Sequence, residues 1–114
     1  MLDFIAAWNR IDFDSVLEFL AEDVFYHNIP MAPIEGRAGV KAFIDAMGKV
    51  EKVQWEVYHI AEVGNVVLTE RLDNFVISGK EISVPVMGTF EIVGGKIQAW
   101  RDYFDLATFQ TQMT

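Results

Sequence analysis

The sequence VVLTERLDNFVI, residues 66–77, predicts a long β-strand because it is rich in β-branched residues and ends at turn signals. Gly64-Asn65 precedes the segment and Ser78-Gly79 follows it, and both pairs are typical of tight hairpin turns. Segments of similar composition flank it over residues 52–63, 81–93 and 96–103. We therefore expect four long antiparallel strands that follow one another as hairpins.

The first half of the chain carries helical periodicity instead. Phe4, Ile5 and Trp8 predict a helix over about residues 4–9, and apolar residues three and four apart predict another over residues 36–49. Between these two segments, either Asp12 or Asp14 can cap a further helix. The apolar face of that helix would consist of Val16, Leu17, Leu20 and Ala21.

The remaining segments complete an α+β pattern. We expect a short strand over residues 24–29, a loop over residues 30–36 and a final helix over residues 106–113. Helices followed by hairpins predict one α+β domain over residues 1–114, with its helices on one face of the sheet. Long curved strands can enclose an apolar pocket, and a filled sandwich without a cavity is the alternative.

Composition excludes several classes of protein. Of the 114 residues, 52% are hydrophobic, so the chain is not a disordered acidic segment. Nine Lys and Arg against 17 Asp and Glu give a net charge of −8, which argues against nucleic-acid and anionic-membrane partners. The absence of cysteine excludes thiol catalysis, disulfides and cysteine zinc sites.

Two further absences shape the expectations. The only histidines, His27 and His59, are far apart and have no carboxylate at a ligand spacing, so we expect no metal site. We see no signal-peptide pattern at the N-terminus and no run of the ~20 apolar residues that a membrane helix needs. A cytoplasmic protein is therefore the expectation.

Charged residues interrupt the strand over residues 66–77. Because side chains alternate along a strand, Arg71 and Asp73 share a face with Thr69 and Phe75. If that face is the covered one, it buries a charged pair, which requires good hydrogen bonds. The alternative is an ordinary salt bridge on the surface.

Two other segments place polar groups among aromatic residues. Asp102 shares a face with Trp100 and Phe104, where it would be desolvated and could act as a base; alternatively, it caps the final helix. Tyr26 and Asn28 share a face of the short strand and could hold a water molecule; alternatively, they are a strand end. Together with the charged pair, these residues would form a catalytic site.

The segments Tyr26-His27-Asn28, Thr69-Glu70-Arg71-Leu72-Asp73 and Trp100-Arg101-Asp102-Tyr103-Phe104-Asp105 resemble the limonene-1,2-epoxide hydrolases over nearly the whole chain. That family has a cone-shaped SnoaL-like, or nuclear-transport-factor-2-like, α+β fold. The resemblance implies a highly curved, mixed or antiparallel sheet that wraps around N-terminal helices and encloses an apolar pocket. It also implies hydrolysis of a small hydrophobic epoxide by water, without a metal or a cofactor.

The resemblance implies roles for five residues. Asp73 would protonate the epoxide oxygen, and Arg71 would orient the two carboxylates. Asp102 would take a proton from a water molecule that Tyr26 and Asn28 hold, and that water would open the ring to a vicinal diol in one step. The expected pocket wall consists of Trp100, Phe75, Val84, Val86, Phe104 and Phe109, although ordinary core positions are the alternative for each of these residues.

Other functions stay open at this point. A SnoaL-like polyketide cyclase or a ketosteroid-isomerase-like enzyme would use one aspartate as a base on a carbon acid. A non-catalytic ligand-binding or dimerisation module would instead leave the polar face exposed or paired structurally. The other face of the sheet carries Leu68, Leu72 and Val76, an apolar stripe that predicts a homodimer.

Overall fold

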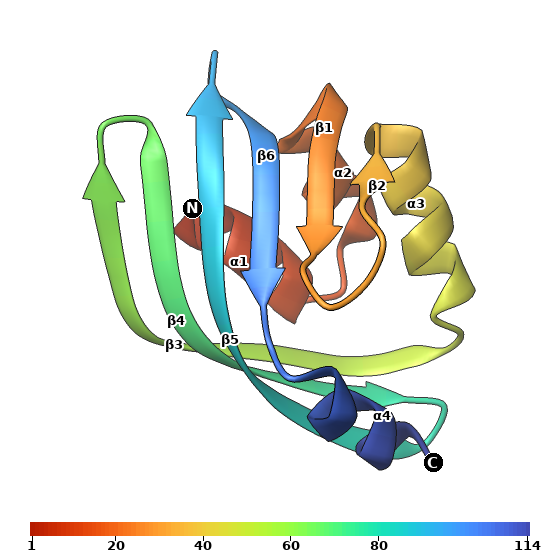
Figure 1. The fold of residues 1–114 in the computed structure, drawn as a ribbon. Coiled ribbons are helices and arrows are strands. Elements are labelled where there is room, and N and C mark those ends of the chain that lie inside the picture. Colours follow the sequence, from red (N-terminus) through yellow and green to blue (C-terminus); the bar gives the residue numbers. More distant parts are fainter.

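The computed structural model describes residues 1–114 and contains four helices and one six-stranded sheet (Figure 1). The helices are α1 (Leu2–Asn9), α2 (Phe13–Glu18), α3 (Arg37–Ala46) and α4 (Leu106–Met113). The strands are β1 (Leu20–Asn28), β2 (Ile34–Glu35), β3 (Val50–Val63), β4 (Val66–Ile77), β5 (Lys80–Val93) and β6 (Lys96–Tyr103). None of the four helices has the length and apolar character that a bilayer-spanning helix requires.

The sheet has the order β2-β1-β6-β5-β4-β3 and is mixed. Strands β3 to β6 are joined as three successive antiparallel hairpins, as the sequence predicts. At the last hairpin, Gly94 and Gly95 have φ angles of 57° and 78°, a backbone conformation that tight two-residue turns require and glycine adopts freely. The expected α+β architecture with a mixed, curved sheet is confirmed.

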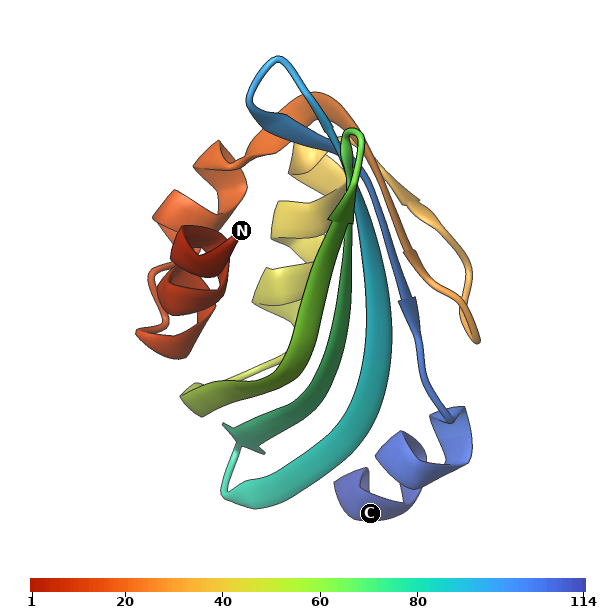
Figure 2. The ribbon, with the colours of Figure 1, turned by 90° about the vertical axis from the view of Figure 1, so that its left-hand side faces the viewer.

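Curvature of the sheet gives the fold its interior. Figure 2 shows the long strands bending around α1, α2 and α3, which lie together on one side of the sheet. The ring of Phe4 on α1 is fully buried and packs edge-on against aromatic rings from the sheet, with centroid distances of 5.3 Å to Trp100, 5.9 Å to Phe90 and 6.1 Å to Trp55. This aromatic cluster joins the helical layer to the sheet.

The segment after α2 differs from the prediction. Leu20 and Ala21 were expected on the apolar face of a helix, but the helix ends at Glu18 and both residues begin β1. Leu20 pairs with Ile97 of β6, whose backbone N–H donates to the carbonyl of Phe19. Helical spacing and the start of a buried strand are indistinguishable over such a short apolar run, and pairing with β6 decides between them.

Two further pairings were not visible in the sequence. Ile34–Glu35, expected within a loop, forms β2 against Tyr26 and Phe25 of β1. Strand β1 also lies parallel to β6, with Tyr26 opposite Trp100 and Asn28 opposite Asp102. This parallel register brings two distant polar segments of the chain together.

Replacement of Phe4 tests how much the aromatic cluster stabilises the fold. We expect Phe4→Ala to lower the free energy of unfolding by about 3–5 kcal/mol, because it removes a large buried ring and leaves a cavity. Urea denaturation followed by tryptophan fluorescence measures the loss. Leu2→Ala on the same helix is the control and should change the free energy by less than about 0.5 kcal/mol, since Leu2 is 65% exposed. A similar, small loss for both variants would contradict this account of the core.

Candidate active site

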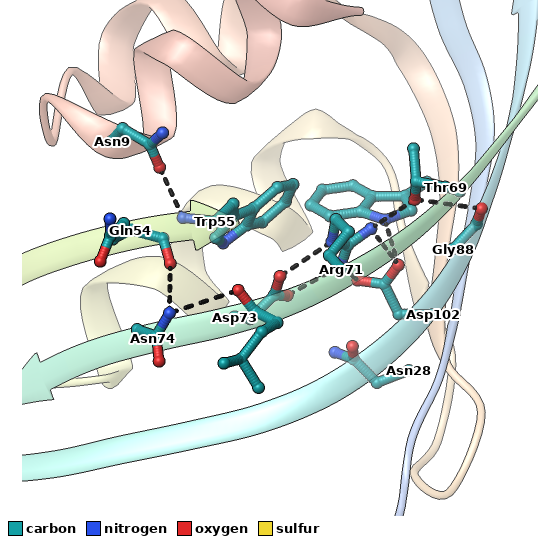
Figure 3. A network of polar contacts seen from close by, with 12 residues as sticks. Asn9, Asn28, Gln54, Trp55, Thr69, Arg71, Asp73, Asn74, Gly88 and Asp102 are labelled. Atoms are coloured by element: carbon teal, nitrogen blue, oxygen red, sulfur yellow. Dashed lines mark hydrogen bonds and ion pairs between the residues drawn. The ribbon is translucent and has the colours of Figure 1, made fainter. Parts of the chain in front are cut away.

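The side chain of Arg71 lies at the centre of a buried polar network (Figure 3). Its Nε and Nη2 atoms each donate to one oxygen of Asp73, both at 2.8 Å. Its Nη1 and Nη2 atoms donate to the two oxygens of Asp102 at 3.2 and 3.1 Å, and Nη1 also donates to Thr69 Oγ1 at 3.1 Å. All five N–H donors of the guanidinium therefore have an acceptor.

Strand register explains how these groups meet. Thr69, Arg71 and Asp73 alternate along β4 and point to the covered face of the sheet, where Arg71 is 1% exposed and Asp73 is 4% exposed. Asp102 reaches the same place from β6, because Thr69 pairs with Gly88 of β5 and Gly88 pairs with Asp102. The charged pair is thus buried, and the alternative of a surface salt bridge is wrong.

Asp102 is held by a third donor besides the two guanidinium nitrogens. The indole Nε1 of Trp100 donates to Asp102 Oδ1 at 2.9 Å. The helix-cap alternative for Asp102 is wrong, since Asp105 caps α4 by accepting from the backbone N–H of Thr108. These contacts leave Oδ2 of Asp102 with the Arg71 donor alone.

The position of Trp100 corrects an expectation. We expected its side chain in the pocket wall, but it is fully buried behind the site and is not among the residues that line the cavity. Its ring stacks on Tyr26 with 4.1 Å between centroids and on Phe90 with 5.5 Å between centroids. Trp100 therefore orients the Asp102 carboxylate through its N–H group.

Tyr26 and Asn28 form a polar pair beside Asp102. Both side chains are 6% exposed, and the hydroxyl of Tyr26 donates to Asn28 Oδ1 at 3.1 Å. Burial and the nearby Asp102 raise the pKa of Tyr26 above its usual value, so this group stays a neutral hydroxyl. The oxygen of Tyr26 and the NH2 group of Asn28 remain available to bind a small polar molecule.

Burial changes the proton affinity of Asp73. Desolvation raises the pKa of its carboxyl group to about 6; hydrogen bonds and charge from Arg71 oppose this rise, and the charge of Asp102 adds to it. Since folding raises this pKa, the folded protein binds the proton more tightly than the unfolded chain. Asp73 therefore costs stability as the pH rises from about 4 to about 6.

Arg71 remains charged within this environment. Burial lowers its pKa, but the charges and hydrogen bonds of Asp102 and Asp73 outweigh that effect and the pKa rises overall. The indole ring of Trp55 covers the guanidinium, with 4.2 Å between Arg71 Cζ and the ring centroid. Arg71 is thus a permanent cation shared by two carboxyl groups.

The network opens into an apolar cavity of about 250 Å³. Four polar side chains reach it, those of Tyr26, Asn28, Asp73 and Asp102. Five of the residues expected in the pocket wall line it: Phe75, Val84, Val86, Phe104 and Phe109. A pocket of this kind suits a small hydrophobic molecule with one polar centre.

Sequence reasoning missed other pocket residues. Trp8, Phe43, Ala46, Met47, Trp55, Ile77 and Met113 also line the cavity. Those on α1 and α3 lie on helical apolar faces, where periodicity indicates burial but does not separate a core position from a pocket wall. Thr69 was placed on the correct face by strand alternation, but its contact with Arg71 was not foreseen.

The arrangement combines three chemical capacities in one cavity. Asp73 can hold a proton at weakly acidic pH, Asp102 can accept one, and the Tyr26–Asn28 pair can bind water between them. No group of three or more His, Asp or Glu side chains gathers as a candidate metal site. The geometry would suit acid–base chemistry on a small molecule in the apolar pocket.

The amino-acid sequence is similar to those of known proteins. The family described as "Limonene-1,2-epoxide hydrolase catalytic domain" matches residues 1–114. Epoxide hydrolase EphG of Mycobacterium tuberculosis (strain ATCC 25618 / H37Rv) is 33% identical over 103 residues, which cover 90% of this chain and 69% of that protein.

Solved structures share the architecture. An M. tuberculosis LEH-like epoxide hydrolase superposes with a TM-score of 0.83 at 33% identity, over 96% of this chain and 82% of that one. An NTF2-like protein of unknown function from Burkholderia pseudomallei K96243 has a TM-score of 0.86 at 20% identity, over 97% and 92% of the two chains, and shows the fold alone. With an NTF2-like fold and a family match over its whole length, the chain belongs to the limonene-1,2-epoxide hydrolase family.

Proposed function

We propose that this protein is an epoxide hydrolase that converts a small hydrophobic epoxide into a vicinal diol. The observation that carries the proposal is the Arg71 guanidinium, which bridges two buried carboxyl groups at the polar end of an apolar pocket. One carboxyl group has a pKa raised to about 6, and the other has a free accepting position on Oδ2. A carboxyl group that holds its proton and a second carboxyl group with a free accepting position can divide the roles of acid and base.

Asp73 is the proposed acid. Each of its oxygens accepts one N–H from Arg71, which leaves a lone pair on each oxygen to carry a proton. Epoxide opening develops negative charge on the ring oxygen, and a proton donor at that atom lowers the barrier. The apolar lining strengthens this interaction because it keeps bulk water away from the reacting atoms.

Asp102 is the proposed base. A water molecule between Asp102 Oδ2, the hydroxyl oxygen of Tyr26 and the NH2 group of Asn28 would be oriented by all three. Its oxygen forms a bond to a ring carbon while the carbon–oxygen bond of the epoxide breaks. Asp102 takes the water proton and Asp73 gives its own proton to the epoxide oxygen, so the diol forms in one step without a covalent intermediate.

The same features weigh against the alternative functions. A carbon-acid enzyme such as a cyclase or isomerase needs one base, and it has no use for a second carboxyl group that shares the same arginine. A non-catalytic module would not place four polar side chains in an otherwise apolar cavity. We therefore favour the hydrolase.

The cytoplasmic location and the lack of a cofactor stay predictions.

Removal of either carboxyl group should slow the reaction strongly. We expect Asp73→Asn and Asp102→Asn each to lower kcat by about 10²–10⁴-fold, since each removes one half of the acid–base pair. The assay incubates limonene oxide, cyclohexene oxide and styrene oxide in ¹⁸O water and detects labelled diol by mass spectrometry. Asp45→Asn is the control, because Asp45 lies on the exposed surface of α3 in an ion pair with Lys41. Full activity in either site variant would refute the proposed roles.

The pH dependence follows from the raised pKa of Asp73. The acid must be protonated in the free enzyme, so kcat/KM should fall as the pH rises above about 6 and approach a tenfold loss per pH unit. Because Asp73 and Asp102 share one arginine, the profile reports the pair rather than one group. A kcat/KM that stays constant from pH 6 to pH 9 would be inconsistent with Asp73 as the acid.

We also propose a homodimer through the outer face of the sheet. Leu68, Met87 and Tyr103 are exposed there on three adjacent strands, with exposed fractions of 42%, 53% and 49%. Leu72 and Val76, the other residues of the predicted stripe, are half-buried on the same face. Exposed apolar side chains on neighbouring strands of one sheet face are typical of an interface between identical subunits, although the charged Glu70 lies on this face too.

A charge at position 87 should separate the subunits. We expect Met87→Glu to convert a dimer into a monomer, because it would place two like charges within a symmetric apolar interface. Sedimentation equilibrium measures the mass. Ile60→Glu is the control: Ile60 is 43% exposed, but it pairs with Thr69, whose side chain points to the covered face. A monomeric wild-type protein would overturn the homodimer.

A further inference from the structure

We propose that Thr69 and Gly88 are positioning residues of this site, which together hold the Arg71 guanidinium where it contacts both carboxyl groups at once. Neither residue lines the cavity. Their role in catalysis rests on the proposed hydrolase function. Their effect on the geometry of Arg71 is independent of it.

Thr69 supplies the one acceptor of Arg71 that is not a carboxylate. Its side chain is 1% exposed, and its Oγ1 accepts from Arg71 Nη1 at 3.1 Å. The same hydroxyl donates to the carbonyl oxygen of Gly88 at 3.3 Å, which fixes the orientation of its lone pairs. Without this hydroxyl, Nη1 would keep only Asp102, and one buried N–H would have no partner.

Gly88 supplies the space that the ion pair occupies. It lies between Thr69 and Asp102 in the register of the three central strands. A Cβ atom at Gly88 would lie 2.4 Å from Arg71 Nη1, 2.5 Å from Asp102 Oδ1 and 3.1 Å from Thr69 Oγ1. The first two distances are far below van der Waals contact, so any other residue would push the guanidinium and the carboxylate apart.

The two residues determine how closely the Arg71 guanidinium lies to each of its two carboxylates. The contacts with Asp73 are shorter, at 2.8 Å, than those with Asp102, at 3.1 and 3.2 Å. Thr69 holds Nη1, the nitrogen that does not contact Asp73. A guanidinium released from Thr69 should therefore move toward Asp73 and away from Asp102, which would make Asp73 a stronger acid and reduce the fraction that carries a proton.

The groups that act on Asp73 define how this movement would be detected. The charged or titratable groups near it are Arg71 on its own strand, Asp102 on β6 and Tyr26 on β1, which keeps its proton. Its cross-strand partners on β3 and β5, Trp55 and Val84, carry no titratable group. A shift of the Asp73 titration then reports a change in its contacts with Arg71 or Asp102.

The test compares Thr69→Val, which has nearly the same shape but no hydroxyl, with Thr69→Ser, which keeps the hydroxyl. Two measurements are made on each protein: the ¹³C NMR titration of the Asp73 carboxyl carbon, and kcat/KM against pH with the best epoxide from the panel. For Thr69→Val we expect about a tenfold lower kcat, with the Asp73 midpoint and the alkaline limb of kcat/KM both moved to lower pH. Thr69→Ser should behave as the wild type.

Gly88→Ala tests the second positioning residue. We expect a larger loss of kcat, about 100-fold or more, because the added methyl group must displace Arg71 or Asp102. The midpoint of the Asp73 titration should also differ from that of the wild type. Thermal unfolding identifies variants that do not fold. If Thr69→Val is unfolded, Thr69→Ala, which also lacks the hydroxyl, is compared with Thr69→Ser in its place. A folded Gly88→Ala with the kcat and the Asp73 midpoint of the wild type would overturn the role of Gly88.

The outcomes separate the two proposals. An unchanged Asp73 midpoint in Thr69→Val, or an equal shift in Thr69→Ser, would overturn the positioning role, since packing rather than the hydroxyl would then explain any loss. If the wild-type protein hydrolyses no epoxide, the proposed function fails. The NMR titration then still decides whether Thr69 and Gly88 position Arg71, because it requires no turnover.

Discussion

The site depends on one interaction, the buried ion pairs that the guanidinium of Arg71 makes with the carboxylates of Asp73 and Asp102. A cation removed from water is stable only when opposite charge and hydrogen-bond acceptors replace its hydration, and here two carboxylates and one hydroxyl accept all five N–H groups. Two ionised aspartates around one arginine would leave an excess negative charge in an apolar surrounding. Burial is the main reason that the pKa of Asp73 rises to about 6, and the charge of Asp102 adds to it; protonation of Asp73 then removes the excess charge.

The fold is arranged so that this network can form at depth. Strands β4 and β6 carry the charged groups, β5 between them offers a glycine in place of a side chain, and the parallel strand β1 adds Tyr26 and Asn28. Helices α1, α2 and α3 lie on the concave side of the curved sheet (Figure 2), and their aromatic and aliphatic side chains exclude water. Apolar residues from α3, α4 and the strands then leave a cavity directly over the carboxyl groups.

Much of this could be predicted from strand alternation and turn chemistry. The period of two placed Thr69, Arg71 and Asp73 on one face, and paired turn residues located the hairpins. The start of β1 and the strand β2 could not be predicted, because short apolar runs favour neither helix nor strand until a partner strand is present. The orientation of Trp100 was missed for a related reason: alternation gives the face of a side chain, not which of its atoms meets a neighbour.

The sequence by itself determined the order of the main helices and the hairpins, which polar residues of a strand share a face and the chemical types of side chain that are present. These properties depend on local backbone preferences and on periodicity, which are encoded within a few consecutive residues. Only the tertiary structure decided that Arg71 bridges Asp73 and Asp102, that Gly88 makes room for this contact and that β1 runs parallel to β6. Those features depend on the relative register of strands far apart in the chain, and register is set by the packing of the whole sheet.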